Sequence, residues 1–143
     1  LCKYIKYIVC SKGFAETVTG MKFDYNNPST LVAIYNKLQD KYPNSNLVIT
    51  LEEKGCLYQV GNEIKIMPGL KVDAVDTTGA GDIFHGAFTY GIANNFDMEK
   101  TITLANIAAG LSVTKIGSRL SIPNLSEVLD YYAKKMGQVN DNQ

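Results

Sequence analysis

The sequence is organised around Val75-Asp76-Thr77-Thr78-Gly79-Ala80-Gly81-Asp82-Ile83-Phe84-His85-Gly86-Ala87-Phe88. Two glycines and an alanine stand between two aspartates, and an apolar pattern with helical spacing follows them. Backbone without bulky side chains at the start of a helix exposes N–H groups that suit an anion. A carboxylate in the same turn would repel a phosphate unless chemistry or a cation requires it there. The stretch therefore predicts a phosphoryl-transfer site.

Composition and charge restrict the class of protein. The chain has 143 residues, of which 45% are hydrophobic and 20% charged, enough for one domain with a single core. Fourteen basic residues balance fourteen acidic ones, so we expect neither a nucleic-acid partner nor a membrane partner. The chain starts with Leu-Cys-Lys rather than Met, and we expect it to begin within a longer protein.

The cysteines and the histidine do not form a metal-binding pattern. Cys2, Cys10 and Cys56 are odd in number and far apart, and His85 is the only histidine, so a zinc site is not expected. We expect free thiols in a cytoplasmic protein, each filling a small apolar position in the core.

Strand and helix patterns alternate on both sides of the central stretch. Strands are predicted at residues 3–10, 47–51, 56–60 and 63–67, the last two forming an antiparallel hairpin. Helices are predicted at residues 12–20 with Ser11 as cap, 30–42 with Ser29 as cap, 82–94, 97–114, and 125–136 with Asn124 as cap. We expect one α/β domain over residues 1–136, with a mostly parallel sheet and one hairpin, followed by a polar tail at 137–143.

The central stretch and its flanks also resemble a known family. Asp76 to Asp82, followed by Phe84-x-Gly86-Ala87, resembles the C-terminal signature of the ribokinase-like (PfkB) sugar kinases. The same order continues in Thr50-Leu51-x-x-x-Gly55, Val113-Thr114-x-x-Gly117 and Ser121-Ile122-Pro123. The resemblance covers nearly all of this chain but only the C-terminal half of a family member. It implies part of a three-layer α/β/α fold.

The resemblance implies a role for each residue at the centre of the stretch. Asp82 would be the catalytic base that takes a proton from a sugar hydroxyl as it attacks the γ-phosphate of ATP. Gly79, Ala80 and Gly81 would form the anion hole that faces the transferred group. The alternative from local sequence is that Asp82 only caps the helix after Gly81.

A nucleotide site is also implied by the resemblance. ATP would arrive with Mg²⁺, held mainly by phosphates and water. Glu52 departs from the glycine of many family members, and Asn106 is expected either at the edge of the adenine pocket or on a helix surface. His85 is expected to pack or to lie at the substrate's edge. The residues implied for ATP are Ser11, Thr50, Glu52, Gly55, Gly79, Gly81 and Asn106.

A monovalent cation, K⁺, is implied beside the anion hole. Carboxylate, hydroxyl and backbone oxygens suit this ion because its coordination geometry is loose. The implied ligands are Asp76, Thr78, Ser112, Lys115, Gly117 and Ser121. The alternative is that Asp76 and Thr78 merely shape the turn.

Our leading interpretation is the C-terminal, ATP-binding and catalytic half of a sugar kinase. In the family the N-terminal half supplies most sugar contacts, so we expect the 143 residues alone to bind ATP weakly and to turn over little or no sugar. A homodimer formed through parts outside this chain stays open. The alternatives are a non-catalytic nucleotide-binding or regulatory relative, an interaction module, and a vitamin kinase of the same superfamily acting on a pyrimidine or pyridoxal alcohol.

Overall fold

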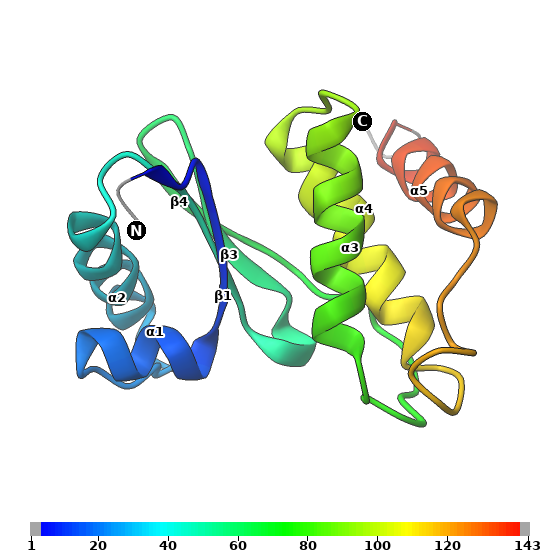
Figure 1. Cartoon of the computed structure of the whole chain (residues 1–143), viewed down its shortest axis with the longest axis horizontal. Helices are drawn as coiled ribbons and strands as arrows, with labels where there is room; N and C mark the ends of the chain where they lie inside the picture. Colours follow the sequence, from blue (N-terminus) through cyan, green and yellow to red (C-terminus); the bar gives the residue numbers. More distant parts are fainter. Residues whose placement is uncertain (1–3, 141–143) are drawn as a thin grey trace. The chain divides into compact units, whose positions relative to one another are not determined.

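The structure, a computed structural model, describes residues 4–140, and the side chains of residues 4–137. It divides into two compact units, residues 1–68 and residues 69–143, and each is described by itself (Figure 1). The boundary falls at Pro68-Gly69, directly after the last strand, where a Pro-Gly pair ends regular structure.

The first unit is built on a four-stranded sheet. Its strands are β1 (Tyr7–Ser11), β2 (Asn46–Thr50), β3 (Cys56–Val60) and β4 (Glu63–Met67), in the order β1-β2-β3-β4. β1 and β2 pair in parallel, β2 and β3 antiparallel, and β3 and β4 antiparallel, which confirms the hairpin. The sheet of the described residues is thus less parallel than predicted. Parallel pairing needs a long crossover, whereas only η2 (Glu52–Lys54) separates β2 from β3.

Two helices of the first unit, α1 (Lys12–Thr19) and α2 (Pro28–Lys41), correspond to predicted segments. Ser11 caps α1 as predicted, because its Oγ accepts the N–H of Phe14 at 3.2 Å. The prediction of Ser29 as the cap of α2 was wrong, since the cap position is Asn27 and Pro28 opens the helix. β1 also begins later than predicted, at Tyr7, and Lys3 lies outside the described residues.

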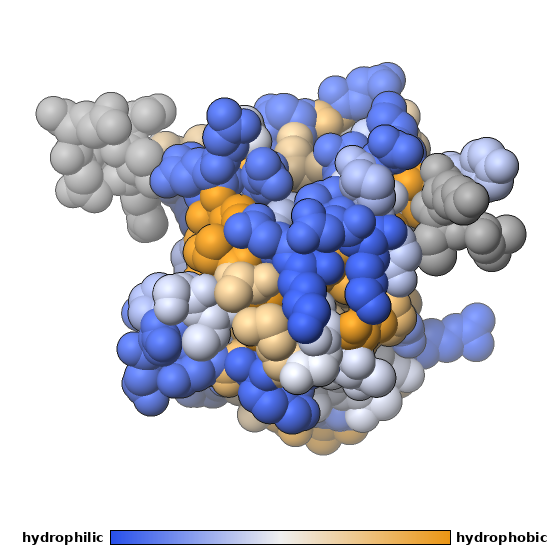
Figure 2. Space-filling model, turned by 90° about the vertical axis from the view of Figure 1, so that its left-hand side faces the viewer, coloured by the Kyte–Doolittle hydropathy of each residue, from blue (hydrophilic) through white to orange (hydrophobic). Residues whose placement is uncertain are grey.

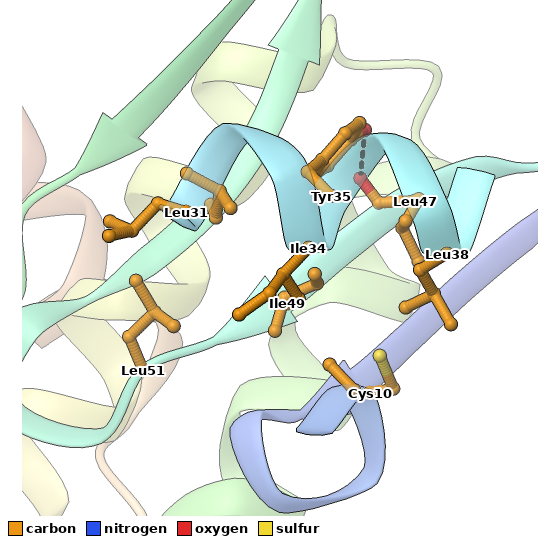
Figure 3. Close-up of a cluster of buried hydrophobic side chains, with 10 residues drawn as sticks. Cys10, Leu31, Ile34, Tyr35, Leu38, Leu47, Ile49 and Leu51 are labelled. Atoms are coloured by element: carbon orange, nitrogen blue, oxygen red, sulfur yellow. Dashed lines mark hydrogen bonds between the residues drawn. The ribbon is translucent and has the colours of Figure 1, made fainter. Parts of the chain in front are cut away.

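The core of the first unit lies between α2 and the strands. The predicted apolar stripe of α2 is buried, and Figure 3 shows it facing Cys10, Leu47, Ile49 and Leu51. The stripe consists of Leu31, Ile34, Tyr35 and Leu38. The Tyr35 hydroxyl donates to the Leu47 carbonyl at 2.9 Å, and burial raises the pKa of Tyr35 to about 12. A buried hydroxyl without this bond would carry a desolvation cost, so the bond fixes the ring.

The outer side of α2 is polar. Asn36, Lys37 and Asp40 are exposed, and the face seen in Figure 2 is largely hydrophilic with smaller apolar areas between. Cys10 and Cys56 are buried thiols outside any disulfide, as predicted, and burial raises the pKa of Cys10 to about 12. A thiol with so high a pKa is not a nucleophile at neutral pH.

The second unit contains three helices, α3 (Ala80–Ala93), α4 (Met98–Ser112) and α5 (Leu125–Asn140). α3 and α4 approach closely at Gly91, where an added Cβ would lie 2.7 Å from the Thr101 side chain. α5 extends beyond the predicted end at Met136, so residues 137–140 of the predicted tail are helical, and residues 141–143 lie outside the description. None of the helices in the described residues could span a membrane.

Candidate functional site

Asp76 ties the central stretch to a loop that follows α4. Its Oδ1 accepts the N–H of Thr78 at 2.9 Å, and its Oδ2 accepts the N–H of Gly117 at 2.9 Å, 41 residues along the chain. Val75 and Asp76 also donate their N–H groups to the Val113 carbonyl, at 2.7 and 3.2 Å. The structure therefore brings the two segments of the predicted cation site side by side.

The oxygen atoms of these two segments are those expected for a hard cation. The carbonyl of Ser112 accepts the N–H of Lys115 at 3.2 Å, and that of Gly117 accepts the N–H of Ser121 at 3.1 Å. Each carbonyl and each carboxylate oxygen retains a second lone pair for a ligand. The described residues hold no group of three His, Cys, Asp or Glu side chains that could bind a metal. A cation here would thus depend on backbone and hydroxyl oxygens beside one carboxylate, which fits K⁺.

The glycine turn before α3 has the shape of an anion site. Gly79 is the N-cap of α3 with φ of 79°, a left-handed conformation that L-residues with a side chain rarely adopt. The N–H of Ala80 donates to Thr77 and that of Ile83 to Gly79, at 3.2 and 3.0 Å. The N–H groups of Gly81 and Asp82 have no acceptor among the described residues. Two donors at the positive end of a helix are available to a phosphate.

Asp82 is the third residue of α3, and its side chain is exposed. It is therefore not the N-cap, and the capping alternative is wrong, because Gly79 holds that position without a side-chain hydrogen bond. Asp82 and Gly79 line one cavity of about 490 Å³. His85 is exposed one turn later, and its Nδ1 lies 2.6 Å from the Gly81 carbonyl.

The cavity is bounded by α3, α4, the start of α5 and the loop between α4 and α5. Two of its lining side chains carry a charge, Asp82 and Arg119, and most of the others are apolar, among them Ile83, Ala87 and Leu104. Sequence reasoning missed Arg119, although it is the only arginine of the chain and follows Gly117 by two residues.

The predicted nucleotide residues of the first unit meet at one edge of its sheet. Ser11 and Thr50 are register partners at the carboxyl ends of the parallel strands β1 and β2. This is the edge at which α/β sheets bind ligands. Glu52 follows with φ of 58° and an exposed side chain, and Gly55 is buried with φ of 96°. Glycine adopts the left-handed backbone conformation of Glu52 freely, so the turn itself suits a glycine. The difference from a glycine at this position therefore lies in the side chain alone.

Asn106 belongs to the second unit. It is buried, 8% exposed, in the middle of α4, and the prediction of a surface position was therefore wrong. The adenine-edge prediction stays a prediction.

Acid is expected to weaken the Asp76 anchor, that is, the hydrogen bonds that the Asp76 carboxylate accepts from Thr78 and Gly117. Hydrogen bonds from the Thr78 side chain, the Thr78 N–H and the Gly117 N–H lower the pKa of Asp76. A lowered folded-state pKa gives stability that is complete above the unfolded value of about 3.9 and is lost as the pH falls through the folded value. At pH 7 we expect the wild-type protein to unfold at a higher urea concentration than the Asp76→Asn variant. This difference between the two unfolding midpoints should shrink below about pH 4.

Urea unfolding at several pH values, followed by circular dichroism, measures this difference. Asp73→Asn, which removes an exposed carboxylate three residues earlier, controls for the loss of a surface charge. A difference between wild type and Asp76→Asn that stays constant from pH 7 to pH 3 would show that the anchor does not depend on ionised Asp76.

Comparison with known proteins adds an independent observation. The sequence profile described as pfkB family carbohydrate kinase matches residues 1–125. A ribokinase of Lactococcus lactis is 42% identical over 88 residues, which make up 62% of this chain and 29% of that protein.

Solved structures give the same result. A putative ribokinase from Agrobacterium tumefaciens superimposes with a TM-score of 0.84 and 26% identity, over 96% of this chain and 43% of that one. Vibrio cholerae fructokinase, solved with fructose, ADP and calcium ion bound, gives a TM-score of 0.68 and 27% identity over 87% of this chain and 40% of that one. The chain thus spans less than half the length of each of these proteins and has a ribokinase-like α/β fold.

Proposed function

Because this chain belongs to the pfkB family of carbohydrate kinases, we propose that it is the C-terminal part of an enzyme that transfers the γ-phosphoryl group of ATP to a sugar hydroxyl. Residues 1–136 would form the ATP-binding and catalytic portion. The observation that carries the proposal is the start of α3. There the N–H groups of Gly81 and Asp82 have no acceptor among the described residues, and the Asp82 side chain lines the same cavity as Gly79.

The proposed reaction divides the work among three groups of residues. Asp82 accepts the proton of the sugar hydroxyl while the hydroxyl oxygen bonds to the γ-phosphorus. The bond from that phosphorus to the β–γ bridging oxygen breaks, and ADP leaves. The turn Gly79–Ala80–Gly81 would form the anion hole, in which the N–H groups of Gly81 and Asp82, without acceptors among the described residues, face the charge on the transferred group. These groups are preorganised because the Asp76 anchor and α3 hold the turn on both sides.

Nucleotide and cations complete the proposal. ATP would bind with its Mg²⁺, as the Vibrio cholerae fructokinase was solved with ADP and a divalent ion. Ser11, Thr50 and the Glu52–Gly55 turn would contact the nucleotide from one sheet edge. K⁺, when bound by the Asp76 and Gly117 segments, would add positive charge near the anion hole.

The test is a panel of sugars with ATP, using the full-length protein that contains this chain, with and without K⁺. We expect phosphorylation of at least one pentose or hexose and faster turnover with K⁺ than with Na⁺. ADP release measured by a coupled assay reports turnover, and mass spectrometry identifies the phosphorylated sugar. Lack of phosphorylation across the panel would refute the kinase proposal, whereas equal rates in K⁺ and Na⁺ would refute only the cation site. The 143 residues alone should show little or no turnover.

A further inference from the structure

Arg119 lines the cavity with a charged side chain, and the proposed reaction does not yet use this side chain. It is the only arginine among 143 residues, beside thirteen lysines. Its exposed side chain lines the cavity that also contains Asp82 and Gly79. No ion pair or hydrogen bond of this side chain occurs within the described residues. The guanidinium is thus available to a ligand.

The loop that carries Arg119 is fixed against the glycine turn. Gly117 donates its N–H to Asp76 at 2.9 Å, and Ser121, 2% exposed, donates its N–H back to the Gly117 carbonyl at 3.1 Å. Between them, Ser118 packs so closely on Gly79 that a Cβ added to Gly79 would lie 2.9 Å from the Ser118 Cβ. Arg119 is therefore the direct neighbour of a residue in contact with the proposed anion hole.

We propose that Arg119 contacts the phosphoryl group during its transfer and acts as a catalytic cation. The inference rests on the proposed kinase function. The acceptor oxygen bonds to phosphorus, the bond to the ADP oxygen breaks, the hydroxyl proton goes to Asp82, and the guanidinium takes no proton. Its planar N–H groups pair with two phosphoryl oxygens at once, a geometry that the ammonium group of lysine cannot reproduce.

The charges of the cavity favour a phosphoryl ligand. Asp82 alone would make the site repel the transferred group, and Arg119 offsets that charge within the same cavity. Two backbone donors and one guanidinium then surround the oxygens on which charge spreads in the transition state. The alternative is that Arg119 binds an anionic substituent on the acceptor sugar. That alternative predicts a change in the KM for the sugar instead of a change in kcat.

The experiment compares Arg119→Ala and Arg119→Lys with wild type in the full-length protein, using the sugar that the panel identifies. We expect Arg119→Ala to lower kcat by about 10²–10³-fold, the usual effect of losing one donor to a transition-state charge. The KM for the sugar should change less than threefold, and Arg119→Lys should recover part of kcat. Lys134→Ala, which removes an exposed cation on α5, is the matched control and should leave kcat unchanged.

Each outcome is decisive. A kcat within threefold of wild type for Arg119→Ala overturns the inference, and so does a loss confined to the KM for the sugar, since that marks Arg119 as a contact to an anionic acceptor. Thermal melts of both variants should match wild type, because the side chain is exposed, and a lower melting temperature for both would assign Arg119 a structural role instead. A wild-type protein inactive on every sugar refutes the kinase proposal and this inference together, whereas active wild type with unaffected variants refutes this inference alone.

Discussion

The Asp82→Asn variant is expected to lower kcat by about 10²–10⁴-fold in the full-length protein, the range that a general base contributes. Asparagine keeps the size of the side chain but cannot take the hydroxyl proton. The KM for ATP should change little, because the proposed phosphate donors are backbone N–H groups at the start of α3, those of Gly81 and Asp82, and not the Asp82 carboxylate. A coupled assay of ADP release over a range of ATP concentrations measures both quantities.

Stability separates this loss from a folding defect. Asp82 lies in the first turn of α3, where a carboxylate interacts with the helix dipole by about 0.3–1 kcal/mol, so the variant should unfold only slightly earlier. Asp73→Asn, also exposed but outside the helix, is the matched control and should retain wild-type turnover. Normal turnover by Asp82→Asn would remove Asp82 from the mechanism.

The Gly79→Ala variant is expected to lose about 10²-fold in kcat, the cost of displacing reacting groups by about an ångström. Two effects coincide at this position. The φ of 79° disfavours a side chain by roughly 1–2 kcal/mol. A Cβ would in addition meet the Ser118 Cβ at 2.9 Å, a distance that forces the turn or the loop to move. Either movement displaces the proposed anion hole from Asp82.

A double-mutant cycle distinguishes the two effects. Ser118→Gly removes the contacting Cβ, so kcat of Gly79→Ala/Ser118→Gly should exceed that of Gly79→Ala if the clash dominates. Gly137→Ala, at an exposed position of α5 with nothing within 4 Å of the added Cβ, is the control and should leave kcat unchanged. Full activity of Gly79→Ala would show that the turn tolerates displacement and that its N–H groups are not the anion hole.

Much of the fold followed from local patterns. The apolar stripe of α2, the β3–β4 hairpin and the cap at Ser11 obey rules of spacing and hydrogen bonding that act over a few residues. Errors arose where two local rules competed. Ser29 has the residue type of a cap. Pro28 suits the first helical position, however, so the helix begins at Pro28 and Asn27 occupies the cap position.

The candidate site divides in the same way. The sequence by itself determined that a glycine turn opens a helix carrying Asp82, because glycines, spacing and an apolar run suffice to predict this. The tertiary structure decided that Asp76 holds Gly117, that Ser118 packs on Gly79 and that Arg119 shares a cavity with Asp82. These contacts join residues about 40 positions apart, and only the packing of α3 and α4 brings them together. Local preferences describe each segment, whereas the meeting of distant segments depends on the core that they bury together.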